Sequence, residues 1–180
     1  EILLSEPLYL PKHLSFGPFN EKTKMSPRVA PSVFGLGLIE AIDSETIKKN
    51  ADPEDKNKDG ISGKPNIVWD EPTKTNKIGR FGWKASRGSL LHQILGAAHE
   101  DMGLSSKVFP HQNCLSKQKK CRDQPTGGKT EITEKQVDKL LLYIQTLAVP
   151  RQRNSKDRSI LKGESLFQSI GCQKCHISTF

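Results

Sequence analysis

The chain has 180 residues, a formal net charge of +8 at pH 7, and no apolar run that approaches the length of a membrane-spanning helix. Its length allows one domain, or one domain and part of another. The 14 glycines and 11 prolines, together with a hydrophobic share of 34%, predict a loop-rich protein with short helices. Because no basic motif is interleaved with aromatic residues, nucleic acid is not an expected partner.

The first third of the chain is predicted to contain two short helices after an irregular segment. Residues 1–33 are rich in proline and indicate extended chain. Residues 34–42 are apolar, contain two glycines and predict a short buried helix. Ser44 is expected to cap a second helical turn over residues 45–50.

Oxygen-bearing side chains alternate at Asp55, Asn57 and Asp59, and a glycine follows. This spacing matches the first half of a calcium loop, in which several oxygens converge on a hard cation and the glycine permits a sharp turn. Ile61 would contribute its backbone carbonyl. The twelfth position holds Asn66 rather than the bidentate glutamate of an EF-hand, so a solvated acidic turn is the alternative.

Two longer helices are predicted further along the chain. Ser89 would begin the first, whose apolar stripe continues as far as Met102. Thr133 and Gln136 have the spacing of a capping box and would begin the second, which Pro150 ends. No segment shows a convincing alternation of apolar and polar residues, so the predicted fold class is mainly α and loop-rich.

The most specific motif is Cys172-Gln-Lys-Cys175-His176, the C-x-x-C-H signature of c-type haem attachment. Both thiols add to the vinyl groups of one porphyrin, and the histidine provides an axial nitrogen to the iron. A thioredoxin-type motif would follow a strand in a βαβ unit, and a zinc site would need a second ligand pair; neither is visible. A helix over residues 163–171 would lead into the attachment loop.

The motif also predicts the compartment. Because haem is attached to such thiols outside the cytoplasm, we expect a periplasmic protein or one attached to the membrane on that side. The other two cysteines, Cys114 and Cys121, are then expected to form a disulfide that closes a short basic loop, with two free thiols as the alternative. The chain starts at Glu1 without a signal segment and ends at Phe180, so we expect an internal fragment of a longer protein.

Several sequence blocks, taken in order, resemble the bacterial di-haem oxidoreductases of the thiol-oxidoreductase-like group, which are similar to di-haem cytochrome c peroxidases. The resemblance covers nearly the whole chain and rests on residues 35–42, 52–63, 79–85, 101–103, 147–150 and 171–176. It implies two cytochrome c-like domains. Residues 1–150 would be the latter part of the first haem domain, 151–158 a linker, and 159–180 the start of the second.

The resemblance further implies roles for two side chains. Such proteins carry an Asp-Met-Gly block after each attachment motif, so Met102 would be the distal ligand of a haem attached upstream. The alternative is a core methionine on the apolar stripe. Trp83 would relay electrons between two haems, or would be an ordinary core aromatic.

The leading interpretation is a periplasmic di-haem c-type cytochrome that binds haem c and transfers electrons to or from a redox partner. The basic charge suits an acidic partner, although a plain solvated surface is the alternative. A second interpretation is a peroxidase that reduces hydrogen peroxide, in which His92, His99 or Glu100 would act as acid or base unless they are solvated surface groups. A third is a calcium-stabilised structural module with a vestigial haem motif.

Overall fold

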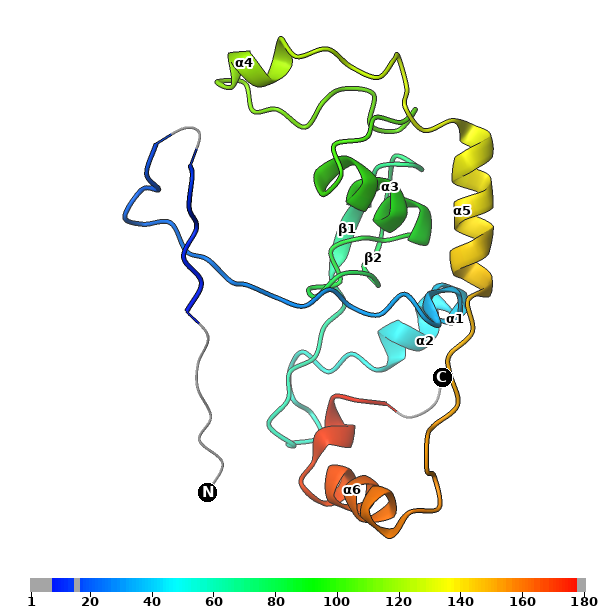
Figure 1. Cartoon of the computed structure of the whole chain (residues 1–180). Helices are drawn as coiled ribbons and strands as arrows, with labels where there is room; N and C mark the ends of the chain where they lie inside the picture. The colour runs from blue at the N-terminus through cyan, green and yellow to red at the C-terminus, as the bar shows by residue number, and fades with distance from the viewer. Residues whose placement is uncertain (1–7, 15–16, 178–180) are drawn as a thin grey trace. The chain divides into compact units, whose positions relative to one another are not determined.

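The computed structural model describes residues 8–14 and 17–177 (Figure 1). Contacts divide the chain into two compact units, Glu1–Ser32 and Val33–Phe180. The described residues of the first unit form neither helix nor strand, as expected for extended chain. They include one turn, in which the backbone N–H of Thr23 donates to the carbonyl of Asn20 at 2.8 Å. Nowhere in the described chain is a helix both long enough and apolar enough to cross a membrane.

The second unit combines short helices with one β-hairpin and a 3-10 turn. In chain order its elements are α1 (Leu36–Ala41), α2 (Ser44–Lys49), β1 (Ile67–Asp70), β2 (Thr75–Ile78), α3 (Leu90–Glu100), α4 (Lys119–Arg122), α5 (Glu134–Thr146), α6 (Arg158–Ser169) and the 3-10 turn η1 (Cys172–Lys174). Long loops join these elements. The predicted class, mainly α and loop-rich, fits this unit loosely, because the unit also contains a two-stranded sheet.

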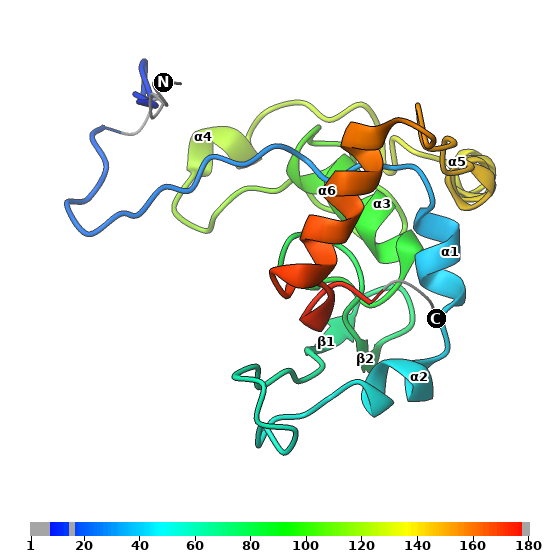
Figure 2. The same ribbon diagram turned by 90° about the horizontal axis from the view of Figure 1, so that it is seen from below.

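The hydrophobic core is small and centres on α3. Phe81, Leu90 and Ile94 form its buried cluster, and residues from α1 and α5 pack against them. Helices α1, α3 and α5 contact one another in pairs, as Figures 1 and 2 show. Leu90 has no exposed surface. Burying such a side chain contributes about 1.5–3 kcal/mol to folding, so α3 is the element around which this unit is stabilised.

The predicted starts of the two longer helices are confirmed. The hydroxyl of Ser89 accepts the backbone N–H of His92 at 3.1 Å and caps α3. Both bonds of the capping box between Thr133 and Gln136 are present at the start of α5. Each bond satisfies an N–H group that has no partner within the helix.

Helix α1 is held by close contact with α5 and by one glutamate. A Cβ atom on Gly37 would overlap the carbonyl oxygen of Gln145, so only glycine allows this approach of the two backbones. The carboxylate of Glu40 accepts the backbone N–H of Leu90 and the side-chain amide of Gln145, each at 2.8 Å. Glu40 therefore ties α1 to both α3 and α5.

Two expectations about the first helices are wrong. The helix expected over residues 34–42 forms as α1, but it has no buried residue, and Leu38 is 67% exposed. In the described chain only Leu36 from this helix packs against the core cluster. The second helix is capped by Asp43 rather than Ser44, because the Asp43 carboxylate accepts the N–H groups of Glu45 and Thr46.

The β-hairpin was not expected from the sequence. β1 and β2 pair antiparallel, with Ile67 opposite Ile78 and Asp70 opposite Thr75. The turn between them closes through a 2.8 Å bond from the Lys74 N–H to the Asp70 carbonyl. In each strand only the last residue is buried, so neither shows the apolar alternation that predicts a strand.

Candidate functional site

Helix α6 leads directly into the C-x-x-C-H motif. The Asp157 carboxylate caps it by accepting the Ser159 hydroxyl at 2.6 Å and the Ser159 N–H at 2.7 Å, and these bonds lower the pKa of Asp157. At the other end Gly171 has φ of 91°, a left-handed conformation that glycine adopts without strain. The chain reverses there, as the sequence predicts, and the motif begins at the next residue.

The motif itself forms a single 3-10 turn. The carbonyl of Cys172 accepts the N–H of Cys175 at 3.2 Å and the N–H of His176 at 2.9 Å. Both cysteines are free thiols; Cys172 is half-buried and Cys175 is exposed. One turn of backbone therefore carries both thiols and the imidazole, which is the local arrangement that attachment to one porphyrin requires.

An apolar surface lies beside this turn. Leu166 is 48% exposed, Phe167 43% and Ile170 72%. The ring of Phe167 lies 5.7 Å from that of His176, centroid to centroid, at an interplanar angle of 57°. A cavity of about 400 Å³ opens here, lined by Glu164, Phe167, Gln168, Gln173 and His176. Free thiols, an exposed imidazole and uncovered apolar side chains fit a flat, apolar, covalently held group such as haem.

Met102 and Trp83 both lie at the surface. Met102 lies two residues beyond the end of α3 and is 69% exposed, and Trp83 is 62% exposed. A core position, the alternative for each of them, is therefore wrong. Their exposure leaves both side chains accessible to a group outside the described chain.

The loop around Asp55 has the turned conformation that its sequence predicts. Both carboxylate oxygens of Asp55 accept the N–H of Gly60, and one also accepts that of Asp59 at 2.9 Å. Asn57 accepts the same Asp59 N–H at 3.0 Å, and Asp59 accepts the Ile61 N–H at 2.9 Å. Among the described residues no group of three or more His, Cys, Asp or Glu side chains could hold a metal ion.

One contact connects this loop with the turn that holds the C-x-x-C-H motif, residues 172–176, which we call the attachment turn. No sequence signal pointed to this contact. The ammonium of Lys174 donates to the carbonyl of Asp59 at 3.1 Å. Lys174 is one of the two residues between the motif cysteines, so its side chain links two segments that are distant in the sequence.

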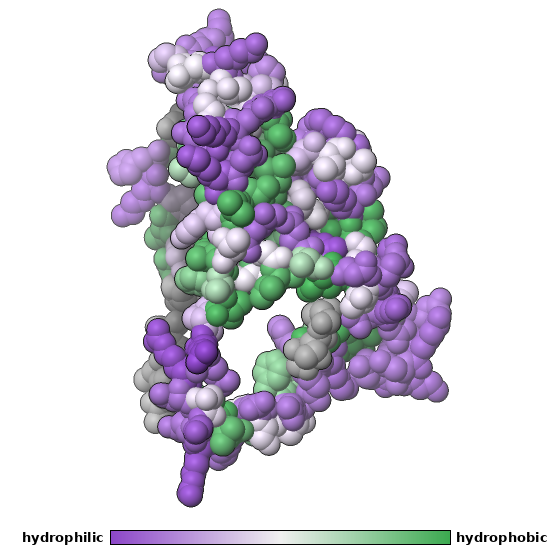
Figure 3. Space-filling model, turned by 90° about the vertical axis from the view of Figure 1, so that its right-hand side faces the viewer, coloured by the Kyte–Doolittle hydropathy of each residue, from purple (hydrophilic) through white to green (hydrophobic). Residues whose placement is uncertain are grey.

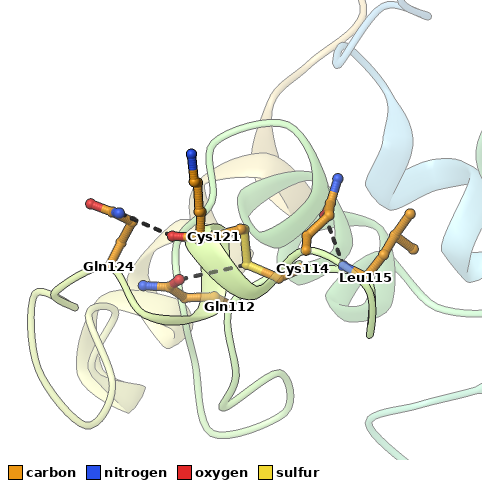
Figure 4. Close-up of a disulfide and its surroundings, with 7 residues drawn as sticks. Gln112, Cys114, Leu115, Cys121 and Gln124 are labelled. Atoms are coloured by element: carbon orange, nitrogen blue, oxygen red, sulfur yellow. Dashed lines mark hydrogen bonds between the residues drawn. A yellow bond between two sulfur atoms is a disulfide. The ribbon is translucent and has the colours of Figure 1, made fainter. Parts of the chain in front are cut away.

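Cys114 and Cys121 are paired as expected. The structure places their sulfur atoms at bonding distance, with the Cα atoms 5.9 Å apart (Figure 4). Within the loop the Gln118 side chain accepts the N–H of Leu115 at 2.9 Å, and from beyond the loop the Gln124 side chain donates to the Lys120 carbonyl at 3.0 Å. These bonds give the short basic loop a defined conformation.

The candidate acids and bases on α3 are engaged in packing contacts. His92 is only 4% exposed, so the alternative of a solvated surface group is wrong for it. Burial lowers the pKa of His92, and the positive charge of Arg87 lowers it further. Glu100 is ion-paired with Arg87. The ring of His99 stacks on Phe109 at 5.0 Å.

Sequence reasoning missed Asp70, whose carboxylate has no exposed surface. It accepts the Ser89 hydroxyl at 2.6 Å and the Thr73 hydroxyl at 2.7 Å, and it lies 3.2 Å from the Lys77 ammonium. The available signal was an aspartate at the end of an apolar run, before a Pro-containing turn. That pattern indicates a turn but does not indicate burial.

Comparison with known families gives one match. The family described as "Di-haem oxidoreductase, putative peroxidase" matches residues 14–180. The match includes every candidate site residue discussed above. No curated protein and no solved structure matches the chain.

Proposed function

Because the chain belongs to the di-haem oxidoreductase family, we propose that it carries haem c covalently and passes electrons through it. The observation that carries this proposal is the single turn that holds Cys172, Cys175 and His176 beside an uncovered apolar surface. The proposal includes a periplasmic location, since haem is joined to such thiols outside the cytoplasm, and a second haem held by sequence that precedes the chain.

Each residue of the site has a distinct part in this proposal. The Cys172 and Cys175 thiols form the two thioether links, and His176 presents its ring nitrogen to the iron. When bound, haem supplies a one-electron redox couple. Phe167 and its apolar neighbours cover the porphyrin face and exclude water, and the Phe167 ring beside His176 restricts the orientation of the imidazole.

Met102 and Trp83 belong to the proposal as the contribution of this chain to the upstream haem. Met102 would provide its thioether as the distal ligand, which raises the reduction potential of the iron. Trp83 would relay electrons between the two haems. Their high exposure supports both assignments, because a group held by another segment can reach them.

The alternative activity is reduction of hydrogen peroxide, which the family description names. A peroxidase needs a haem with an exchangeable coordination site, and ligation by Met102 would close that site on the upstream haem. The spin state of each haem therefore separates the two activities. A low-spin upstream haem supports electron transfer, whereas a high-spin one supports peroxidase activity.

Calcium at the Asp55 loop is a separate proposal. Asp55, Asn57 and Asp59 would each offer an oxygen, and Ile61 its carbonyl. The turned conformation of the loop supports it. Through Lys174, an ordered loop would also steady the attachment turn.

Haem attachment is tested by intact-mass spectrometry of the protein from a host that attaches haem. We expect a covalent porphyrin adduct that is lost in the variant Cys172→Ser/Cys175→Ser. The matched control is Cys114→Ser/Cys121→Ser, which removes the same number of cysteines and should retain the adduct. Absence of any adduct in the parent protein would refute the proposed function.

A further inference from the structure

The segment between α3 and α5 has a large excess of basic over acidic side chains. Residues 106–130 contain six basic side chains and one acidic one, Asp123, for a net charge of +5 out of +8 for all 180 residues. The basic residues are Lys107, Lys117, Lys119, Lys120, Arg122 and Lys129. We call residues 106–130 the basic excursion.

The base of the basic excursion is closed by paired hydrogen bonds. The Glu131 carboxylate accepts the N–H of Ser105 at 2.8 Å and its hydroxyl at 2.9 Å. The carbonyl of Ser105 accepts the N–H groups of Glu131 and Ile132, at 3.1 and 3.0 Å. Ser105 is 5% exposed, so these bonds are shielded from water. The chain therefore leaves and returns at one fixed point.

The tip of the basic excursion is closed as well. Cys114 and Cys121 are joined there, and Cys121 belongs to α4, which ends before Asp123. In both Figure 1 and Figure 2 α4 lies apart from α3 and α5. Figure 3 shows hydrophilic side chains at the upper end of the molecule, where Figure 1 places α4. The basic side chains are therefore carried by a segment whose base and tip are both held in a defined conformation.

The cations at the tip have no acidic partner among the residues that the structure describes. Lys107 pairs with Glu134 at 2.5 Å, but across the described chain no acidic side chain forms an ion pair with Lys117, Lys119, Lys120 or Arg122, all of which are exposed. Unpaired like charges repel one another, so an external anion would lower their electrostatic energy.

We propose that the basic excursion is the docking surface for an acidic redox protein, the partner that the proposed electron transfer requires. This inference rests on the proposed function. Charge complementarity of this kind accelerates encounter between proteins more than it strengthens the complex. Rapid encounter and release suit electron transfer, whose complexes bury little surface.

The composition of the basic excursion favours a protein over other polyanions. Lysines dominate, and their ammonium groups act as point charges, whereas arginine is the residue that binds phosphate bidentately. The segment's one Phe, Tyr or Trp side chain, Phe109, is stacked on His99 rather than presented to bases. Leu115 is its one large exposed apolar side chain, which is too little for insertion into a lipid surface.

The test uses the haem-loaded protein and stopped-flow measurement of haem reduction by reduced plant-type ferredoxin, a small acidic protein. The variant Lys119→Glu/Lys120→Glu reverses two charges of the basic excursion. Its control, Lys49→Glu/Lys64→Glu, reverses two exposed lysines elsewhere and changes the net charge equally. Duroquinol, a small neutral reductant, measures haem reduction without docking.

We expect the second-order rate constant with ferredoxin to fall about tenfold at low ionic strength in the excursion variant. The control should lose less than about twofold, because long-range effects of net charge are smaller than local ones. The rate with duroquinol should be the same in both. The rate with ferredoxin should also depend less on salt in the excursion variant than in the parent protein.

Three results would overturn the docking surface while leaving the proposed function intact. The first is equal loss in both variants, and the second is no loss in either. The third is loss of binding to phosphatidylserine vesicles or single-stranded DNA in the excursion variant with an unchanged ferredoxin rate. If the parent protein contains no haem that duroquinol reduces, the proposed function itself fails, and the docking surface with it.

Discussion

The hydroxyl of Ser89 donates a 2.6 Å hydrogen bond to the carboxylate of Asp70 and thereby joins the β-hairpin to the first turn of α3. The same hydroxyl accepts the backbone N–H of His92, so one side chain both caps the helix and binds the strand. Burial alone would raise the pKa of Asp70, but hydrogen bonds from Ser89, Thr73 and Lys77 outweigh it and lower the pKa. This carboxylate is therefore charged and fully enclosed.

Replacing Asp70 by alanine should lower the free energy of unfolding by about 3 kcal/mol, because the half-buried Lys77 ammonium and two hydroxyls lose their partner. Urea unfolding measures the change. Asp138→Ala, on the exposed side of α5, is the control and should stay within about 0.5 kcal/mol of the parent. A loss at Asp70 no larger than that of the control would show that the network adds nothing to stability.

The pH dependence of stability should contain a contribution from His92. Burial and Arg87 lower the pKa of His92 in the folded protein, so the unfolded chain, with an ordinary value of about 6.5, binds the proton first. Stability from this group is complete above about pH 6.5 and declines as the pH falls toward the folded pKa. In His92→Gln, urea unfolding at about pH 7.5 and pH 5.5 should show a smaller difference than in the parent.

The control for His92 is His111→Gln, because His111 is exposed. That variant should keep the pH dependence of the parent protein. If the free energy of unfolding changes between the two pH values as much in His92→Gln as in the parent protein, the contribution assigned to His92 is wrong.

The close approach of α1 to α5 predicts opposite effects at two glycines. In Gly37→Ala the new methyl group would overlap the Gln145 carbonyl, and forcing the helices apart should cost about 2 kcal/mol. Gly163, inside α6, has open space where a Cβ would lie. Gly163→Ala should stabilise by up to about 1 kcal/mol, because alanine is the better helix former. Thermal unfolding of both variants measures the contrast, and stabilisation by both would disprove the tight crossing.

The proposed ligation by Met102 can be tested against Met25, the other methionine of the chain. Both are exposed, at 69% and 51%, so neither alanine variant should change stability by more than about 0.5 kcal/mol. In the di-haem protein, Met102→Ala should abolish the far-red band of a methionine–iron bond and lower the reduction potential. Met25→Ala should do neither. Identical spectra and potentials for both variants would remove Met102 from the coordination proposal.

Calcium binding predicts a ligand-dependent stability. Adding calcium at about 100 times its dissociation constant should raise the free energy of unfolding by about 2.7 kcal/mol. Asp55→Asn retains an oxygen that can accept the loop N–H groups but removes a charge that the cation needs, so it should lose this gain. Titration calorimetry with magnesium serves as the control for non-specific binding. No heat with calcium would leave the loop as a solvated turn.

The starts of α3 and α5 were predicted well because a cap depends on residues only a few positions apart. Ser89 and the Thr133–Gln136 pair satisfy backbone groups of their own helices, whatever surrounds them. The order of α6, the Gly171 reversal and the attachment turn was predicted for the same reason. The hairpin was missed because its four-residue strands each bury a single residue and carry no periodic signal.

Burial, in contrast, was predicted poorly. The apolar segment of residues 34–42 suggested a buried helix, yet α1 offers only Leu36 to the core, and Leu38 faces outward. Met102 continues an apolar stripe in the sequence, but α3 ends at Glu100, so the stripe no longer applies at that position. Asp70 shows the opposite error, since a charged side chain became the most enclosed group of the hairpin.

Residue types and their local spacing were enough to predict haem attachment, because the placing of two thiols and an imidazole on one turn is a local property of the chain. The sequence also determined the family, through blocks of residues in a fixed order. The enclosure of Asp70, the exposure of Met102 and Trp83, and the closure of the basic excursion by Ser105 and Glu131 became evident only from the folded chain. Those properties depend on contacts between segments that are distant in the sequence, and the local spacing of residues does not specify such contacts.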